Sequence, residues 1–173
     1  MTDDQAWRGR MGGMSPEEVE QFLAEGHNMS LACLKPNGDP YQTVCWHEWA
    51  DGAFWVVPRQ KSPWGGYLKN DPRCSFAVAR WDPLQKVWGE GRAELVEEPN
   101  VGGKWVPVVE RMSLRYVGPD GPTYLVSTLQ QPRWLFRIVP TVIKTWQGGG
   151  WARRYWVEDS GGPSWDEAHG AAG

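Results

Sequence analysis

The stretch PYQTVCWHEWADGAFWVVPRQKSPWGGYLKNDPRCSFAVARWDPLQKVWGEGRA, residues 40–93, decides the fold of this chain. Its hydrophobic pattern predicts a strand, a hairpin, a strand, a basic turn, a capped helix and two further strands. Asp51-Gly52 is the hairpin signal. Short strands joined by hairpin turns predict an antiparallel barrel or sandwich. The strands are expected over 41–49, 53–57, 74–79 and 86–96.

The turn Arg59-Gln60-Lys61-Ser62-Pro63-Trp64 carries the chemistry of this stretch. Ser62 is placed to cap the helix that follows, and Pro63 suits its first position. A helix N-terminus offers unpaired N–H groups and the positive end of the helix dipole. With Arg59 and Lys61 beside it, this helix start is a candidate phosphate-binding site. The alternative is an ordinary capped helix in a solvated basic loop.

A helix is predicted to begin at Ser15-Pro16-Glu17-Glu18, ahead of the first strand at 29–34. Ser15 is its cap, and Glu18 closes a capping box with it. The apolar stripe of this helix consists of Val19, Phe22 and Leu23.

Two helices and three strands are predicted in the last third of the chain. The helices cover 106–116 and 120–130, and the strands cover 133–139, 141–147 and 151–157. Three glycines at 148–150 are predicted to form a hairpin turn. They are not a nucleotide-binding GxGxxG motif, because that motif requires a helix that this segment lacks. The apolar strand positions predict a core that includes Leu31, Val44, Phe54, Val56, Phe76, Val78, Val87, Leu95, Leu135 and Ile138.

We expect one domain over 14–157, between a flexible arm of 1–13 and a disordered tail of 158–173. The arm has no periodic pattern, and the tail is rich in Gly, Ser, Asp and Ala. A chain of 173 residues suits a single compact domain.

Composition excludes several functional classes. The net charge of −3 gives no broad attraction to nucleic acid or acidic lipid. No run of 18 apolar residues exists and the first residues are polar, so we expect a soluble, cytoplasmic protein. The three cysteines and three histidines follow no disulfide or metal-site spacing. The 13 tryptophans suit a core, a subunit interface or a pocket for a flat ligand.

Residues 40–93 resemble the pyridoxamine 5′-phosphate oxidase-like family of flavin-binding split barrels. The matching features are Pro40-Tyr41-Gln42, the Gly52 hairpin, Ser62 in the basic turn, the run Leu68-Lys69-Asn70-Asp71-Pro72-Arg73 and the strand with Gly91-Arg92-Ala93-Glu94. The helix from Ser15 and the run from Ile138 to Trp146 also fit. The resemblance implies a mainly β, six-stranded antiparallel split barrel with peripheral helices. It also implies a homodimer with two flavin sites at the subunit interface.

The resemblance assigns the cofactor site residue by residue, with FMN as the expected cofactor. The phosphate is implied to lie against Arg59, Lys61, Ser62 and Trp64. The ring system is implied to lie along Thr43, Val44, Cys45, Trp46, Val56 and Val57. A polar side chain from the partner subunit, Gln85 or Lys86, is implied to complete the site.

Two departures from the family pattern affect this site. Many members have a lysine at the position of Trp64 and an arginine at the position of Thr43. Arg59 and Lys61 are candidates to replace that charge, and Trp64 either stacks on a ring or packs its helix. A substrate-gripping arginine-x-histidine motif is also missing after Trp146, so we do not expect oxidation of vitamin B6. Other members bind a deazaflavin coenzyme or haem in the same cleft.

We expect a flavin-dependent oxidoreductase that transfers hydride or electrons to or from a small planar organic substrate. The alternatives are a deazaflavin-dependent reductase and a carrier or sensor that binds flavin or haem without turnover. Because adjacent strand residues face opposite ways, we expect one of His47 and Glu48 in solvent and the other packed, not a proton-transfer pair. Candidate residues on the substrate side are His47, Trp146, Gln147, Trp151, Arg153 and Arg154.

Overall fold

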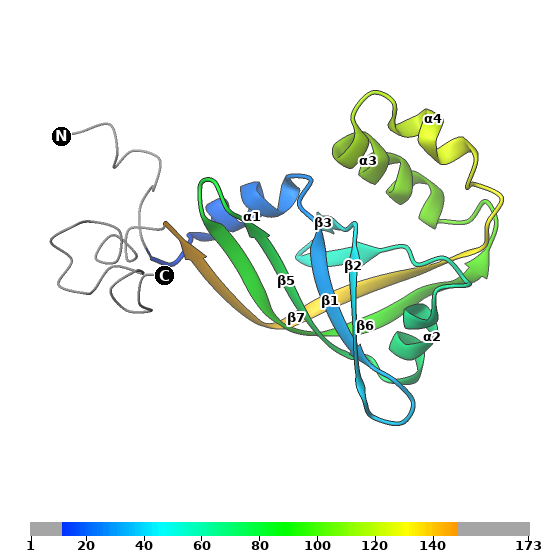
Figure 1. Ribbon diagram of the computed structural model, residues 1–173, viewed down its shortest axis with the longest axis horizontal. Helices are drawn as coiled ribbons and strands as arrows, with labels where there is room; N and C mark the ends of the chain where they lie inside the picture. Colours follow the sequence, from blue (N-terminus) through cyan, green and yellow to red (C-terminus); the bar gives the residue numbers. More distant parts are fainter. Residues whose placement is uncertain (1–11, 149–173) are drawn as a thin grey trace, which may run out of the picture.

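The computed structural model describes residues 12–148 and builds them around one antiparallel sheet of seven strands (Figure 1). The strands are β1 (Met29–Leu34), β2 (Pro40–Cys45), β3 (Glu48–Ala50), β4 (Ala53–Val56), β5 (Arg73–Arg80), β6 (Gln85–Asn100) and β7 (Arg133–Gln147). The helices are α1 (Pro16–Ala24), α2 (Pro63–Asn70), α3 (Trp105–Val117) and α4 (Gly121–Val126). The expected strand at 151–157, the tail at 158–173 and nearly all of the arm lie outside the described residues.

The sheet has the strand order β2-β1-β5-β6-β7-β4-β3, so its two edge strands are consecutive in the chain. Trp46 and His47 alone separate the end of β2 from the start of β3. Two intervening residues span only about 10 Å, so the sheet must curl until its edges approach each other. This curl agrees with the barrel that the family resemblance implies, whereas the strand pattern alone left a barrel and a sandwich open.

The resemblance implies six strands and the described sheet has seven, and two parts of the chain differ from the strands that the pattern predicts. The segment predicted as one strand over 41–49 is two strands on opposite edges of the sheet. The two strands predicted around Pro140 are instead one strand, β7. A register shift opposite Pro140, between Glu90 and Gly91, accommodates a residue that lacks an N–H group.

Several local predictions are confirmed. Ser15 Oγ accepts from the Glu18 N–H at 3.2 Å, and the Glu18 carboxylate accepts from the Ser15 N–H at 2.6 Å, which completes the capping box. Asp51 and Gly52 have φ of 53° and 67°, as a two-residue hairpin between β3 and β4 requires. The helix predicted over 120–130 is shorter, because α4 ends at Val126.

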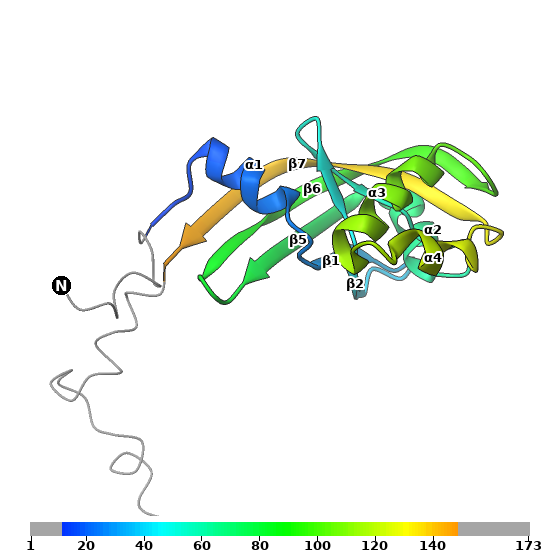
Figure 2. The ribbon, with the colours of Figure 1, turned by 90° about the horizontal axis from the view of Figure 1, so that it is seen from above.

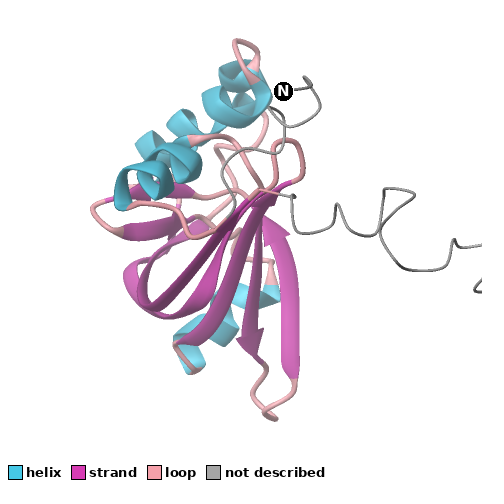
Figure 3. Ribbon diagram, turned by 90° about the vertical axis from the view of Figure 1, so that its left-hand side faces the viewer, coloured by secondary structure: helices cyan, strands magenta, loops and turns pink. Residues whose placement is uncertain are grey.

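Two apolar clusters fill the structure. The main core lies between α1, α2 and the inner face of the sheet, and a second cluster joins α3 and α4 to β7 through Leu135. Figure 2 shows α1 at one end of the long β6–β7 pair and the α3–α4 pair at the other. Helices lie at both ends of the strands in Figure 3. Because Leu135 packs with α3 and α4 while Phe136 belongs to the main core, the start of β7 is covered on both faces.

Eight of the ten predicted core residues are buried, and Val44 and Leu95 are not. Val44 is 64% exposed because β2 is an edge strand whose inward positions are Tyr41, Thr43 and Cys45. Leu95 is 38% exposed and borders a register shift in β6, where the inward–outward alternation breaks.

Candidate functional site

A cavity of about 390 Å³ lies where the end of β2, the segment after β4, the start of α2 and the α3–α4 pair meet the first residue of β7. It brings together nine of the twelve residues that the resemblance implies for the cofactor: Thr43, Val44, Cys45, Trp46, Val57, Arg59, Lys61, Ser62 and Trp64. Sequence reasoning missed the other five lining residues, which are Pro58, Val109, Met112, Tyr124 and Arg133. Val56 is buried in the adjacent core.

The basic turn is held against the start of β7 by backbone hydrogen bonds. Arg59 forms an antiparallel bridge with Arg133, and the Gln60 N–H donates to the Pro132 carbonyl at 2.8 Å. Ser62 is the N-cap residue of α2, but its side chain makes no capping hydrogen bond, contrary to the prediction. The hydroxyl therefore has no capping role and lines the cavity instead.

Arg133 is a third cation of the cavity, and it is only 7% exposed. Burial lowers the pKa of its guanidinium first, and the nearby charge of Arg59 lowers it further. Within residues 12–148, no carboxylate forms an ion pair with Arg59, Lys61 or Arg133. The part of the cavity lining that these three residues form is therefore strongly cationic.

The residues next to Arg133 in the sequence do not identify it as part of a binding cavity. Its strand begins Arg-Trp-Leu-Phe, and Leu135 and Phe136 are both buried because different helices cover the two faces of β7. The docking of α3 and α4 adds Val109, Met112 and Tyr124 to the lining of the cavity that Arg133 also lines.

Two aromatic side chains, Trp46 and Tyr124, also line the cavity, and together with Tyr116 they form an aromatic wall. Trp46 stacks on Tyr116 with ring centroids 5.0 Å apart and an interplanar angle of 10°. Tyr124 lies 5.8 Å from Trp46, tilted by 51°. Trp64 is 7% exposed and belongs to the main core, so it packs its helix and presents only part of its surface to the cavity.

His47 and Glu48 are both buried, so the expectation that one would face solvent is wrong. The chain leaves β2 and enters β3 at this point, and strand alternation does not continue through the break. Arg111 Nε donates to both carboxylate oxygens of Glu48, at 2.9 and 3.0 Å. Glu48 is therefore fixed in an ion pair.

His47 lies behind the aromatic wall and does not line the cavity. Its Nδ1 lies 3.1 Å from the Tyr116 hydroxyl, and its Nε2 is buried without a hydrogen-bond partner in the described part of the chain. Burial lowers the pKa of His47 to about 4, with a further contribution from Arg115. The imidazole is therefore neutral at physiological pH.

Gln85, Lys86, Trp146 and Gln147 lie at the far end of the β6–β7 pair, where Gln85 pairs with Gln147 and Lys86 with Trp146. Arg133 and Gln147 are the two ends of β7, separated by roughly 45 Å of extended strand. These residues therefore cannot reach the cavity of their own chain. Trp151, Arg153 and Arg154 lie outside the described residues.

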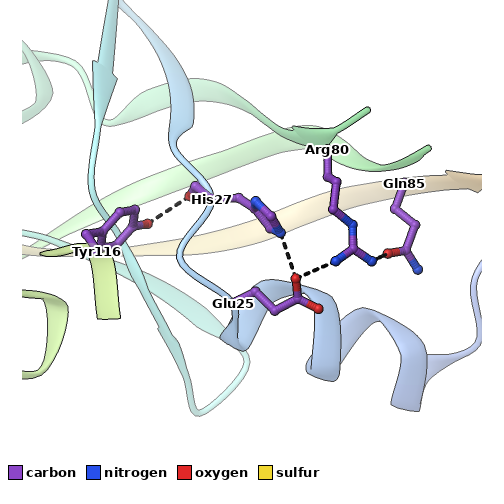
Figure 4. A network of polar contacts seen from close by, with 5 residues as sticks. All are labelled: Glu25, His27, Arg80, Gln85 and Tyr116. Carbon is purple, nitrogen blue, oxygen red and sulfur yellow. Dashed lines mark hydrogen bonds and ion pairs between the residues drawn. The ribbon is translucent and has the colours of Figure 1, made fainter. Parts of the chain in front are cut away.

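A polar network extends from the aromatic wall toward that far end (Figure 4). The Tyr116 hydroxyl donates to the His27 carbonyl at 2.8 Å, and His27 Nε2 lies 2.8 Å from Glu25. Arg80 donates to the same Glu25 oxygen at 2.6 Å and also to Gln85. The network fixes α1, β5 and α3 relative to one another.

A larger hollow of about 520 Å³ lies along β1, β5 and β6, lined mainly by small and apolar residues. Of its two arginines, Arg73 is already paired with Asp71 at 2.6 Å. None of the residues that the sequence predicted for the cofactor lines it. The 390 Å³ cavity is therefore the better candidate site.

The sequence profile of the pyridoxamine 5′-phosphate oxidase family matches residues 15–147, which is most of the chain. The chain belongs to this family. This membership confirms the resemblance drawn from residues 40–93. A comparison with curated proteins gave no match. In the described part of this family member, no helix is long and apolar enough to cross a membrane.

Solved structures support the family assignment. The conserved hypothetical protein Rv2991 of Mycobacterium tuberculosis is 31% identical, with a TM-score of 0.62 over 82% of this chain and 89% of that chain. An FAD-binding protein of Mesorhizobium loti is 17% identical, with a TM-score of 0.59 over 81% and 98% of the two chains. An F420 reductase is 21% identical, with a TM-score of 0.57 over 75% and 98%. The last two likenesses show a shared fold.

Proposed function

We propose that this family member is an FMN-dependent oxidoreductase that transfers hydride or electrons to or from a small planar organic substrate. One observation carries the proposal: a single cavity is lined both by cations that form no ion pair within residues 12–148 and by the aromatic side chains Trp46 and Tyr124. FMN has a phosphate, which complements the cations, and a flat ring system, which complements the aromatic side chains. The FAD-binding neighbour supports a flavin in this fold.

The cationic part of the lining suits the phosphate. Arg59, Lys61 and the start of α2 converge on the cavity, and guanidinium and ammonium groups form strong charge-assisted hydrogen bonds with phosphate oxygens. The Ser62 hydroxyl, which does not cap the helix, is a further donor. These groups supply the charge that the family pattern places at the positions of Thr43 and Trp64.

The end of β2 and the aromatic wall suit the ring system. β2 is an edge strand of the described sheet, so some backbone N–H and C=O groups along Thr43 to Cys45 face away from β1. Such groups suit the heteroatoms along one edge of a flavin ring. Trp46 offers a flat surface beside them.

A bound flavin supplies the hydride and electron chemistry, and the chain binds, orients and shields it. Arg59 and Lys61 anchor the phosphate, while Trp46 limits where the ring lies. The ion pair of Glu48 with Arg111 and the burial of His47 leave both side chains away from the cavity, so neither moves a proton there.

We also propose that the protein is a homodimer in which the partner's copy of the β6–β7 end completes each cleft. The support is that Gln85, Lys86 and Trp146 lie too far along the sheet to reach their own cavity. Sedimentation equilibrium tests this proposal, and a monomer at concentrations where cofactor binds would contradict it.

A deazaflavin-dependent reductase is the second candidate. Arg59, Lys61 and Arg133, which form no ion pair within residues 12–148, together carry more charge than one phosphate, and a deazaflavin coenzyme carries additional carboxylates on its tail. The F420 reductase neighbour supports this alternative. Titration of the apoprotein with FMN, F420 and haem, followed by quenching of tryptophan fluorescence, separates the three cofactors.

The site itself is tested by the double substitution of Arg59→Ala and Lys61→Ala. We expect cofactor affinity to fall by about 100-fold, because charge-assisted hydrogen bonds are lost, while the fold is retained. Lys35→Ala, in the turn that follows β1, is the matched control for charge. Bleaching of the bound cofactor by reduced nicotinamide, and its recolouring by an electron acceptor, then separates an enzyme from a carrier. Unchanged cofactor affinity in the double variant would contradict the proposed phosphate-binding site.

A further inference from the structure

Arg133 is a buried arginine with an unusual set of partners. It is 7% exposed, and within residues 12–148 no carboxylate pairs with it. Its neighbour across the backbone bridge is a second arginine, Arg59. Charged groups are rarely buried without a counter-ion, because removal from water costs more than their other contacts return. The arrangement is expected where a ligand brings the missing negative charge.

Other residues hold the guanidinium in place. Its Nη2 donates to Thr128 Oγ1 at 2.9 Å, and the Thr128 hydroxyl donates in turn to the Leu125 carbonyl at 3.0 Å. The guanidinium also lies over the Trp105 ring, 5.3 Å from its centroid. Trp105 is fully buried. Arg133 is therefore a rigid cation that does not depend on solvent for its position.

The remaining donors of Arg133 are not used. Its Nε is buried without a hydrogen-bond partner in the described chain, and Nη1 forms no hydrogen bond there. Arg133 lines the same cavity as Arg59, Lys61 and Ser62. The cavity is therefore bordered by a cationic residue of β7 as well as by those of the basic turn.

We propose that Arg133, held by Thr128 and Trp105, is a phosphate-binding residue that makes the site select ligands ending in a doubly charged phosphate monoester. A phosphate monoester carries close to two negative charges at neutral pH, which matches the excess of cations better than a neutral or singly charged group does. The inference rests on the proposed function for the identity of the whole ligand, but its phosphate chemistry is tested separately.

The competing explanation is structural. The hydrogen bond to Thr128 and the contact with Trp105 join α4 and α3 to β7, and Arg133 would then serve only to dock the helices. The two explanations differ in what they predict for ligands with and without a phosphate. A docking role affects both ligands equally, whereas a phosphate-binding role affects only the phosphorylated one.

The first experiment compares FMN with riboflavin, which lacks the phosphate. Dissociation constants are measured for the flavin-free protein and for Arg133→Met, Arg133→Lys and Thr128→Val. We expect Arg133→Met to weaken FMN binding by about 10- to 100-fold and to leave riboflavin binding within about twofold. Arg133→Lys and Thr128→Val should give smaller losses for FMN alone. Equal weakening of both ligands, or no change in FMN binding, would overturn the inference.

The second experiment does not need a flavin. Thermal unfolding of the apoprotein is followed with sodium pyrophosphate, and with sodium chloride at the same ionic strength as a control. We expect pyrophosphate to raise the melting temperature of the unsubstituted protein by several degrees and to protect the Arg133→Met protein far less. Equal protection of both proteins, or no protection of the unsubstituted one, would overturn the inference.

Together the experiments keep the two proposals separate. Pyrophosphate protection that depends on Arg133, without binding of any flavin, supports the phosphate role and contradicts the proposed cofactor. If Arg133→Met does not fold, Arg133→Lys and Thr128→Val are compared instead. Both variants retain most of the local packing. If neither variant shows a reduced preference for FMN over riboflavin, the inference is overturned.

Discussion

Arg59 and Arg133 face each other across an antiparallel backbone bridge at the edge of the cavity, and neither forms an ion pair with a carboxylate of the described chain. The charge of Arg59 contributes to the lowered pKa of Arg133. Two like charges held together, with no carboxylate of residues 12–148 paired to either, destabilise the unliganded fold. This is the expected arrangement at a site built for an anion, where binding and stability oppose each other.

That opposition gives the first prediction. Arg133→Met removes the buried charge and retains an apolar stem, so we expect the free energy of unfolding of the apoprotein to rise by about 1 kcal/mol. Urea denaturation without ligand measures the change. A loss of more than about 2 kcal/mol would show that the contacts with Thr128 and Trp105 are mainly structural.

The packing of α2 gives a second prediction, with two adjacent glycines as a matched pair. A Cβ atom at Gly65 would lie 2.7 Å from Cδ1 of Trp134, whereas one at Gly66 would meet nothing within 4 Å. We expect Gly65→Ala to destabilise the fold by about 1–3 kcal/mol through overpacking, and to weaken cofactor binding by displacing the helix start. Gly66→Ala should stabilise it by about 0.5–1 kcal/mol. Similar effects at the two positions would contradict the close packing of α2 against β7.

The buried His47 gives a third prediction, on pH. Its pKa is about 4 in the folded protein and 6.5 in the unfolded chain, so between these values the unfolded state binds more protons. The stability associated with neutral His47 is therefore full above pH 6.5 and is lost as the pH falls towards 4, by roughly 3 kcal/mol in total. Denaturation at several pH values should show that the free energy of unfolding falls less steeply with decreasing pH in His47→Gln than in the unsubstituted protein. Parallel curves would show that His47 titrates normally.

The aromatic wall gives a fourth prediction. Trp46→Leu removes a flat surface from the cavity lining but leaves the cations intact. We expect FMN and riboflavin affinity to fall together, by about three- to tenfold, because stacking on an aromatic ring is worth about 0.5–1.5 kcal/mol. The ratio of the two affinities should not change, in contrast to Arg133→Met. Loss of FMN binding alone would contradict the placement of the ring at Trp46.

Part of this site could be predicted from the sequence because its signals are local. The basic turn, Pro63 and the Asp51-Gly52 hairpin are short patterns with direct structural meaning, and the family resemblance then placed Thr43 to Trp46 beside them. The structure brings these segments into one cavity. Their role in binding remains a prediction that the variants above test.

The rest depends on contacts between distant segments. Arg133 appears in the sequence as the polar start of an apolar strand, and its role follows only from the bridge to Arg59 and the docking of α3 and α4. The burial of both His47 and Glu48 was missed because the break after Cys45 carries no glycine or proline to mark it. Val44 was placed in the core because an apolar pattern does not identify an edge strand.

The most direct measurement is the absorption spectrum of the purified protein, followed by mass analysis of the molecule that heat releases from it. We expect flavin absorption bands and a released molecule with the mass of FMN, in about one copy per chain. If the protein is colourless as purified, incubation with FMN should produce the same spectrum and the same bound mass. Release of a deazaflavin or haem, or failure to retain FMN after incubation, would contradict the proposed cofactor.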